Sequence, residues 1–332
     1  MHPHLLNQSE IGTTIQSFKN KKIVVIGDLM IDHYLWGQVE RISPEAPVPI
    51  VDVQKQEYRL GGAANVVNNI ISLNACPLVI GLTGEDIFSE ALFSIFLEKG
   101  IITDFIIKDD SRPTTVKSRI FASGQQVMRY DQEQRADISE SIEEIVLNKL
   151  DLALKEADAL LIEDYNKGLL TPKIIKSAIQ KALDCKIPVT VDPKFKNFFE
   201  YTNCTVFKPN FNELQKNLGV EISDDESLKK AAFDLFRRIN PEYLVITLGE
   251  KGLMIFDKEN NVTQIPTFAK EVFDVSGAGD TVISVLTLCL SVGLDIKTSA
   301  IIANQAAGAV CGKRGIHPAS VEDILEGIGD RG

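Results

Sequence analysis

Short runs of apolar residues alternate along the chain with segments of helical periodicity. The apolar runs span 22–28, 78–82, 159–164, 188–192, 205–207 and 243–247, and helical segments include 63–73, 141–155, 171–183 and 227–238. Continuous apolar strands separated by helices are typical of a mostly parallel sheet with helices on both faces. The pattern therefore predicts an α/β protein, and we find no internal repeat or low-complexity linker in it.

Two segments depart from this rhythm and predict additional β structure. Residues 34–53 are rich in proline, and residues 112–131 alternate apolar and polar positions around a turn at Ser123-Gly124. Alternation on both sides of such a turn indicates a β-hairpin. We expect the two segments to pair into a small sheet that projects from the main domain as a lid, a dimer surface or both. An ordinary edge hairpin is the alternative.

Several of the predicted strands end in an acidic residue, among them Asp28, Asp164 and Asp192. Ligands of open α/β sheets bind beyond the carboxyl ends of the strands. Taken singly, each acid is also a common helix N-cap. Taken together, the three acids favour a polar crevice at this edge of the sheet.

The strongest candidate for chemistry is the segment Asp274-Val275-Ser276-Gly277-Ala278-Gly279-Asp280-Thr281. The residues that follow, 281–294, are apolar almost all round, which predicts a buried helix. The free amides and dipole at the start of a helix bind phosphate. A carboxylate beside such a cradle, here Asp280, suits phosphoryl transfer to a hydroxyl group, because it accepts the hydroxyl proton. The alternative is an acid that only complements the helix dipole.

A second glycine motif, Gly61-Gly62-Ala63-Ala64-Asn65, opens the predicted helix 63–73. Glycines allow the backbone to approach a ligand closely, and Asn65 offers hydrogen bonds to a diol. Close helix–sheet packing with a surface asparagine is the alternative. Neither a G-x-x-x-x-G-K-[ST] motif nor a complete dinucleotide fingerprint is present, so phosphate binding requires a different design, and a hydride-transfer enzyme is disfavoured.

Composition narrows the class of protein further. The 332 residues are 44% hydrophobic and 24% charged, with a net charge of −11. No basic stripe is available for nucleic acid. The five scattered cysteines indicate reduced residues of a cytoplasmic protein, and the four histidines lack zinc-ligand spacing. Residues 1–20 form a polar segment that we expect to be a flexible tail without a signal peptide. The longest apolar run is too short to cross a membrane.

The two glycine motifs in this order resemble those of ribokinase-family (PfkB-type) carbohydrate kinases, over about residues 20–325. A narrower resemblance, to the heptose 7-phosphate kinases of lipopolysaccharide core synthesis, rests on 27–32, on Ser43-Pro44-Glu45-Ala46-Pro47 within 41–49, and on 59–66, 164–168, 191–194, 209–213 and 249–252. The resemblance implies a ribokinase-like kinase domain over 21–328 that carries a small β lid. It further implies that ATP phosphorylates the anomeric hydroxyl of D-glycero-β-D-manno-heptose 7-phosphate, with Mg²⁺ as cofactor.

On this reading Asp280 is the general base, and the backbone at Gly277, Ala278 and Gly279 stabilises the transferred phosphoryl group. The sugar would be held by Asp28, Asp32, Gly61, Gly62 and Asn65, and its phosphate by cations chosen from Lys167, Arg129, Lys194 and Arg41. For each of these cations a surface charge is the alternative. The resemblance assigns Lys194, Asn210, Glu213, Thr247, Gly249, Gly252 and Asn304 to the nucleotide, Glu213 also to Mg²⁺, and Asp274 to a monovalent cation such as K⁺.

Three residues depart from the pattern of the heptose kinases. His33 replaces an arginine, Phe195 a glycine and Lys208 a threonine. We expect a homodimer. In many relatives an adenylyltransferase domain is fused at the C-terminus of the kinase, and this chain resembles either a stand-alone kinase or a piece of a fused one. We therefore also expect a separate adenylyltransferase in the same pathway. Another kinase of the same family, acting on a different sugar, and a catalytically silent sugar-binding regulator remain the alternatives.

Overall fold

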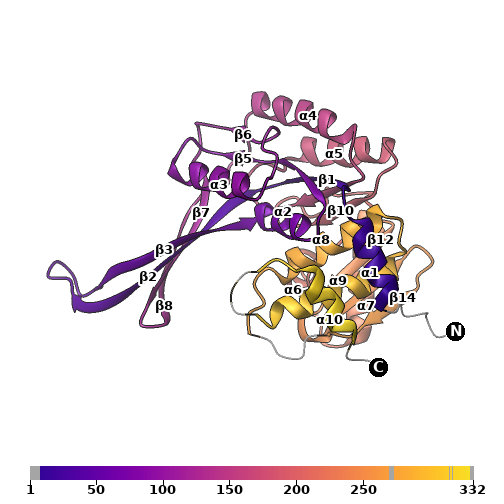
Figure 1. Ribbon diagram of the computed structural model, residues 1–332. Helices are drawn as coiled ribbons and strands as arrows, with labels where there is room; N and C mark the ends of the chain where they lie inside the picture. Colours follow the sequence, from indigo (N-terminus) through magenta and orange to yellow (C-terminus); the bar gives the residue numbers. More distant parts are fainter. Residues whose placement is uncertain (1–7, 269–272, 314, 316, 330–332) are drawn as a thin grey trace.

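The computed structural model describes residues 8–268, 273–313, 315 and 317–329 and shows an eight-stranded sheet at the centre of the chain (Figure 1). Its strand order is β14-β13-β12-β11-β10-β9-β1-β4. The bounds are β1 Lys22–Gly27, β4 Cys76–Ile80, β9 Ala159–Glu163, β10 Val189–Asp192, β11 Val206–Phe207, β12 Tyr243–Thr247, β13 Leu253–Asp257 and β14 Val262–Ile265. The strands from β4 to β12 pair in parallel, and β13 and β14 add an antiparallel edge.

Helices cover both faces of this sheet, because successive strand residues point to opposite sides. Ile23 and Val25 of β1 pack into one core, and Val24 and Ile26 into the other. The first core is completed by α1 Gln8–Ser17, α2 Ala63–Ser72, α3 Ile87–Glu98, α8 Ala278–Ser291, α9 Ile296–Cys311 and α10 Val321–Gly329. The second is completed by α4 Glu140–Leu154, α5 Pro172–Asp184, α6 Phe211–Leu218 and α7 Asp225–Ile239. The predicted α/β architecture is confirmed.

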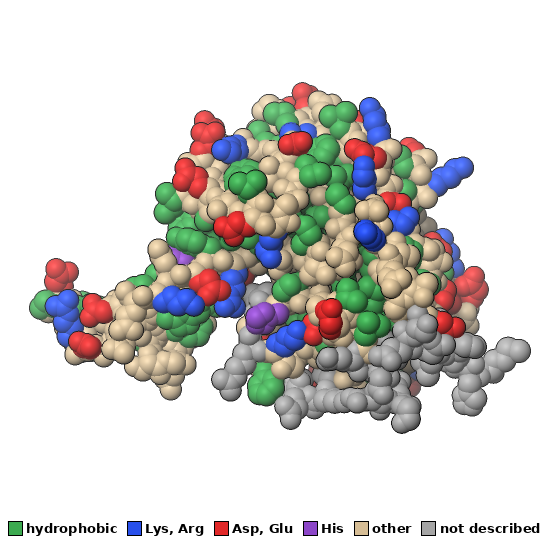
Figure 2. Space-filling model, in the orientation of Figure 1, with side chains coloured by type: hydrophobic (Ala, Val, Ile, Leu, Met, Phe, Trp, Pro, Cys, Tyr) green, Lys and Arg blue, Asp and Glu red, His purple; other side chains and the backbone are tan. Residues whose placement is uncertain are grey.

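A second sheet, which we call the arm, projects from the body (Figures 1 and 2). It contains β3 Pro49–Gly62, β2 Leu29–Ile42, β7 Thr115–Ala122 and β8 Gln125–Gln132, in that order. The hairpin predicted around Ser123-Gly124 is confirmed as β7 and β8, and the two β segments do pair, through the parallel contact of β2 with β7. The short strands β5 Leu82–Thr83 and β6 Ile107–Lys108 form a separate pair.

The two faces of the arm differ in character near the body. Ile31, Leu60 and Val116 lie in the hydrophobic core. The alternate positions carry charge: Asp32 is the register partner of Lys117, and Lys117 is the partner of Asp131. We call this side the charged face, and it comprises Asp32, Lys117, Arg119, Arg129 and Asp131. Strand alternation thus turns a charged surface away from the core.

The chain start differs from the sequence prediction. Residues 1–7 lie outside the described residues, but Gln8–Ser17 form helix α1. Ile11, Ile15 and Phe18 are at most 2% exposed and pack in the core. Their spacing of four and three residues places them on one helix face, so a flexible tail over residues 1–20 is wrong for its second half. Among the described residues, no helix is long and apolar enough to cross a membrane.

Candidate active site

Helix α8 presents its N-terminus and Asp280 to the interior of the molecule. Its N-cap is Gly277, whose φ of 83° lies in the left-handed region that favours glycine. Residues 280–289 are all buried, which confirms the predicted buried helix, although it begins at Ala278 rather than Thr281. Among the residues that the structure describes, no side chain caps this helix. Asp280 therefore does not serve as a cap, and its carboxylate is available for other contacts.

Two side chains hold the Asp280 carboxylate in place. Asn65 Nδ2 donates to Oδ2 at 2.7 Å, and the Tyr165 hydroxyl donates to Oδ1 at 3.0 Å. Asp280 is 7% exposed, and this burial raises the pKa of its carboxyl group. The bond from Asn65 opposes that rise, Asp192 adds to it, and Tyr165 and Lys208 oppose it. A carboxylate with a raised pKa is a better proton acceptor than one in water.

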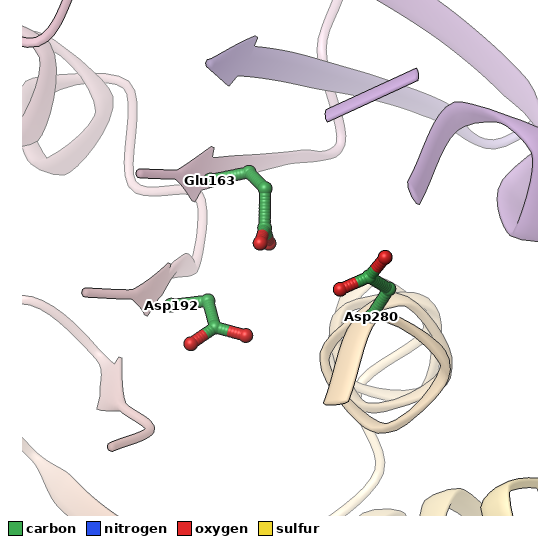
Figure 3. A group of neighbouring side chains, drawn as sticks. All are labelled: Glu163, Asp192 and Asp280. Atoms are coloured by element: carbon green, nitrogen blue, oxygen red, sulfur yellow. The ribbon is translucent and has the colours of Figure 1, made fainter. Parts of the chain in front are cut away.

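Glu163 and Asp192 extend from the ends of neighbouring strands toward Asp280 (Figure 3). One carboxylate oxygen of each of the three residues lies within 4.8 Å of the others. Glu163 is fully buried, and within the described part of the chain neither of its carboxylate oxygens has a hydrogen-bond partner. Burial raises the pKa of Glu163 well above its ordinary value, and Asp192 and Asp280 reinforce the shift. An unpartnered, buried pair of oxygens is costly, which indicates a ligand at this position.

Lys208 lies beneath the cradle and partly offsets the acidic charge. Its ammonium group pairs with Asp192 Oδ2 at 2.8 Å, and the lysine is 2% exposed. A Cβ on Gly279 would lie 3.7 Å from Lys208 Nζ, so the ammonium borders the turn that opens α8. Lys208 thus places a fixed positive charge next to the predicted phosphate cradle.

A cleft of about 1010 Å³ opens in front of α8. The predicted nucleotide and cradle residues that line it are Lys194, Asn210, Thr247, Gly249, Gly252, Asn304, Gly277, Ala278, Gly279 and Asp280. Tyr165, Asp192 and Lys208 line it as well. The structure therefore brings residues that lie far apart in the sequence to the walls of one cavity, which is the size of a small-molecule site.

Glu213 supports this cleft from behind. Its Oε1 accepts from Lys194 Nζ at 2.6 Å, and its Oε2 accepts from the backbone amide of Asn210 at 2.9 Å. Asn210 Oδ1 accepts in turn from the backbone N–H of Glu213 at 2.9 Å, so the two residues form a capping box at α6. Burial would lower the pKa of Lys194, but Asp192 and Glu213 raise it above its ordinary value. Lys194 is thus a charged residue in the cleft wall.

The predicted sugar-binding residues Asp28, Asp32, Gly61, Gly62 and Asn65 are not among the residues that line this cleft. A Cβ on Gly61 would lie 2.6 Å from Asp32 Oδ2, so a larger residue would force the Asp32 carboxylate to move. Asp28 Oδ2 accepts the backbone N–H groups of Tyr165 and Lys167 at 2.9 and 3.0 Å. Asp28 thus fixes the loop that carries Tyr165. Burial and the nearby Asp164 raise the pKa of Asp28 to about 6.

The four predicted cations are placed differently. Lys194 lines the cleft, and Lys167 is 12% exposed and pairs with Glu133 at 2.6 Å. Arg129 pairs with Asp131 on the charged face. Arg41 is exposed and lies nine positions beyond Asp32 on β2, which is roughly 30 Å of strand. The structure therefore does not bring Arg41 to the site of its own chain.

Sequence reasoning missed Tyr165 and Glu163, which lie next to Asp280. Two of the residues that depart from the heptose-kinase pattern, His33 and Phe195, do not line the cleft. His33 is buried on the face of β2 opposite Asp32 and stacks on Tyr58 at 4.7 Å, so it does not reach the cleft. Phe195 is 49% exposed, with Lys216 over its ring. Asp274 accepts the Ser276 amide at 2.9 Å, and the K⁺ site proposed for it stays a prediction.

The family of the chain follows from comparison with known sequences. The model of the pfkB family carbohydrate kinases matches residues 20–323. The chain belongs to this family. The Bifunctional protein HldE of a Nitratiruptor species is 45% identical over 305 residues, which cover 92% of this chain. The chain spans 64% of the length of that relative.

Solved structures show the same fold. The ribokinase of Arabidopsis thaliana, complexed with ribose and ATP, superposes with a TM-score of 0.73 and 18% identity, and the match covers 93% of this chain and 99% of the ribokinase. Phosphofructokinase-2 of Escherichia coli in complex with potassium gives 0.74 and 18%, with 94% and 99% covered. The predicted ribokinase-like fold is confirmed.

Proposed function

We propose that this chain transfers a phosphoryl group from ATP to the anomeric hydroxyl of D-glycero-β-D-manno-heptose 7-phosphate and so forms the 1,7-bisphosphate, a step of ADP-heptose synthesis. The observation that carries the proposal is the Asp280 carboxylate, which is buried beside the start of α8 and held by Asn65 and Tyr165. The choice of sugar is supported by the Ser43–Pro47 segment and by the identity to the HldE relatives.

In this reaction Asp280 accepts the proton of the sugar hydroxyl. The hydroxyl oxygen then attacks the terminal phosphorus of ATP, and ADP leaves. Backbone amides at Ala278, Gly279 and Asp280 and the ammonium of Lys208 stabilise the charge that develops on the transferred group. Lys194 stands in the cleft wall for the other phosphates.

The acidic residues at this edge of the sheet fit Mg²⁺. Glu163 and Asp192 would supply the oxygen ligands that Mg²⁺ prefers, and no other described residue hydrogen-bonds to the carboxylate of Glu163. The ion, when bound, would neutralise the negative charge of the phosphate groups. The resemblance assigns this role to Glu213, but the two oxygens of Glu213 are already occupied by Lys194 and Asn210. We therefore place Glu163 and Asp192 before it.

Three further expectations belong to this proposal. A homodimer that forms through the arm is supported by its exposed apolar residues, among them Ile42, Val53 and Met128, at 61%, 50% and 57% exposure. We also propose that the chain acts in the cytoplasm. A separate adenylyltransferase would act at a later step of the same pathway if the chain acts without a fused one.

The proposal is tested by ADP release with Mg²⁺-ATP and a panel of acceptors: heptose 7-phosphate, fructose 6-phosphate, ribose and fructose. Turnover that is fastest on heptose 7-phosphate supports the proposal. Faster turnover on another sugar moves the substrate and leaves the reaction class in place. No turnover on any acceptor, with ATP still bound, supports a catalytically silent regulator instead.

A further inference from the structure

Lys117 stands out on the charged face because it lacks a partner of opposite charge. Arg119 Nη1 pairs with Asp32 Oδ1 at 2.5 Å, and Arg129 pairs with Asp131 at 2.6 Å. Among the residues that the structure describes, no carboxylate forms an ion pair with Lys117. Its ammonium group lies instead 5.0 Å from the centre of the Tyr165 ring.

The surroundings of Lys117 carry excess positive charge. Burial lowers the pKa of the Lys117 ammonium, and Asp32 raises it, whereas Lys167, Arg129 and Arg119 each lower it further. Three cations are therefore close enough to repel it. The nearby carboxylates Asp32, Asp131 and Glu133 are each paired with one of those three cations. A half-buried cation among other cations is stabilised by an anion between them.

The position of Lys117 relative to Asp280 indicates which anion would bind there. Tyr165 lies between them: its ring faces the Lys117 ammonium, and its hydroxyl donates to Asp280 at 3.0 Å. An anion at Lys117 is thus about one aromatic side chain away from the base. The cleft in front of α8 is lined by Tyr165 but not by Lys117, so this anion is separate from the phosphates of the nucleotide.

We infer that Lys117 binds the phosphate group of the sugar substrate and selects phosphorylated over plain sugars, with Lys167, Arg119 and Arg129 completing the pocket. The inference rests on the proposed function for the sugar, although the anion site itself does not require turnover. Lys167 and Arg129 were expected at such a site from the sequence. Lys117 adds the one cation whose charge, among the described residues of the pocket, is not already matched by a carboxylate.

The test compares wild type with Lys117→Met, which keeps the length of the side chain and removes the charge. The measured quantity is kcat/KM for heptose 7-phosphate divided by kcat/KM for the same heptose without phosphate. We expect this ratio to fall about 10- to 100-fold, as for the loss of a charge-assisted hydrogen bond, and Lys117→Arg to restore most of it. A ratio equal to that of wild type overturns the inference.

Lys108→Met is the matched control, because the exposed Lys108 ammonium lies 5.3 Å from the Phe93 ring and away from the charged face. It should leave the ratio unchanged. If wild type turns over neither sugar, the proposed function fails, and calorimetric titration with inorganic phosphate decides the inference. Weaker phosphate binding by Lys117→Met than by Lys108→Met supports the anion site, and equal binding overturns it.

Discussion

Tyr165→Phe removes one hydrogen bond from the Asp280 carboxylate and leaves the aromatic ring in place. The hydroxyl of Tyr165 donates to Asp280 Oδ1 at 3.0 Å, and this bond favours the ionised form of the acid. Its loss therefore raises the pKa of Asp280. Because the ring stays, the contacts of Lys117 and Lys194 with it, at 5.0 and 5.2 Å, are retained.

The expected size of the effect follows from the kind of bond. A hydrogen bond to a charged group contributes about 1.5–3 kcal/mol, which corresponds to a shift of about one to two pKa units. The base must be ionised to accept a proton, so kcat/KM falls as the pH drops through the pKa of Asp280. We expect Tyr165→Phe to move this acidic limb to higher pH by about one to two units.

The assay is the pH profile of kcat/KM for the sugar at saturating Mg²⁺-ATP. Tyr201→Phe provides the control, because Tyr201 is also buried and donates to a different carboxylate, Asp164 Oδ2, at 2.7 Å. That variant should leave the acidic limb where it is in wild type. An unmoved limb in Tyr165→Phe, or the same shift in both variants, would show that the Tyr165 hydroxyl does not set the pKa of Asp280.

Two further predictions concern the cradle and the loop. Gly279→Ala should fold normally, since its Cβ would make only ordinary contacts of 3.7 and 3.8 Å. It should lower kcat/KM about 10²-fold, because the added methyl group displaces the phosphoryl group. A variant that loses thermal stability along with its activity would contradict this prediction. The pKa of Asp28 is raised from 3.8 to about 6 in the folded state, so the folded protein binds the proton more tightly, and wild-type stability should fall by up to about 3 kcal/mol as the pH rises from about 4 to about 7. Asp28→Asn should flatten that dependence in urea unfolding, and an unchanged slope would show that Asp28 is not its source.

The features that the sequence predicted are those with a local signal. The glycine segment at the start of α8 and the acid Asp280 lie within one short window of the chain. Each strand of the predicted pattern is also a short run of apolar residues. The cleft residues followed from resemblance. Helix α1 was missed because three apolar residues in a polar segment give a weak periodicity. The antiparallel edge formed by β13 and β14 was missed because the sequence of a short strand does not indicate its direction in the sheet.

Contacts between distant segments could not be predicted in this way. Lys117 reaches the site only because β7 pairs in parallel with β2, which sets Lys117 beside Asp32. At the end of β9, sequence reasoning placed Asp164 in the crevice. Strand alternation instead turns Glu163 toward Asp280 and leaves Asp164 bonded to Tyr201. Which of two adjacent acids faces the site depends on the register of the whole sheet.

The central claim is that Asp280 accepts the proton of the sugar hydroxyl. The most direct measurement is ADP release from Mg²⁺-ATP and heptose 7-phosphate by wild type and Asp280→Asn, with ATP binding measured on both proteins. We expect intact ATP binding and a loss of about 10²–10⁴-fold in kcat for the variant. Turnover by Asp280→Asn at the wild-type rate would contradict it.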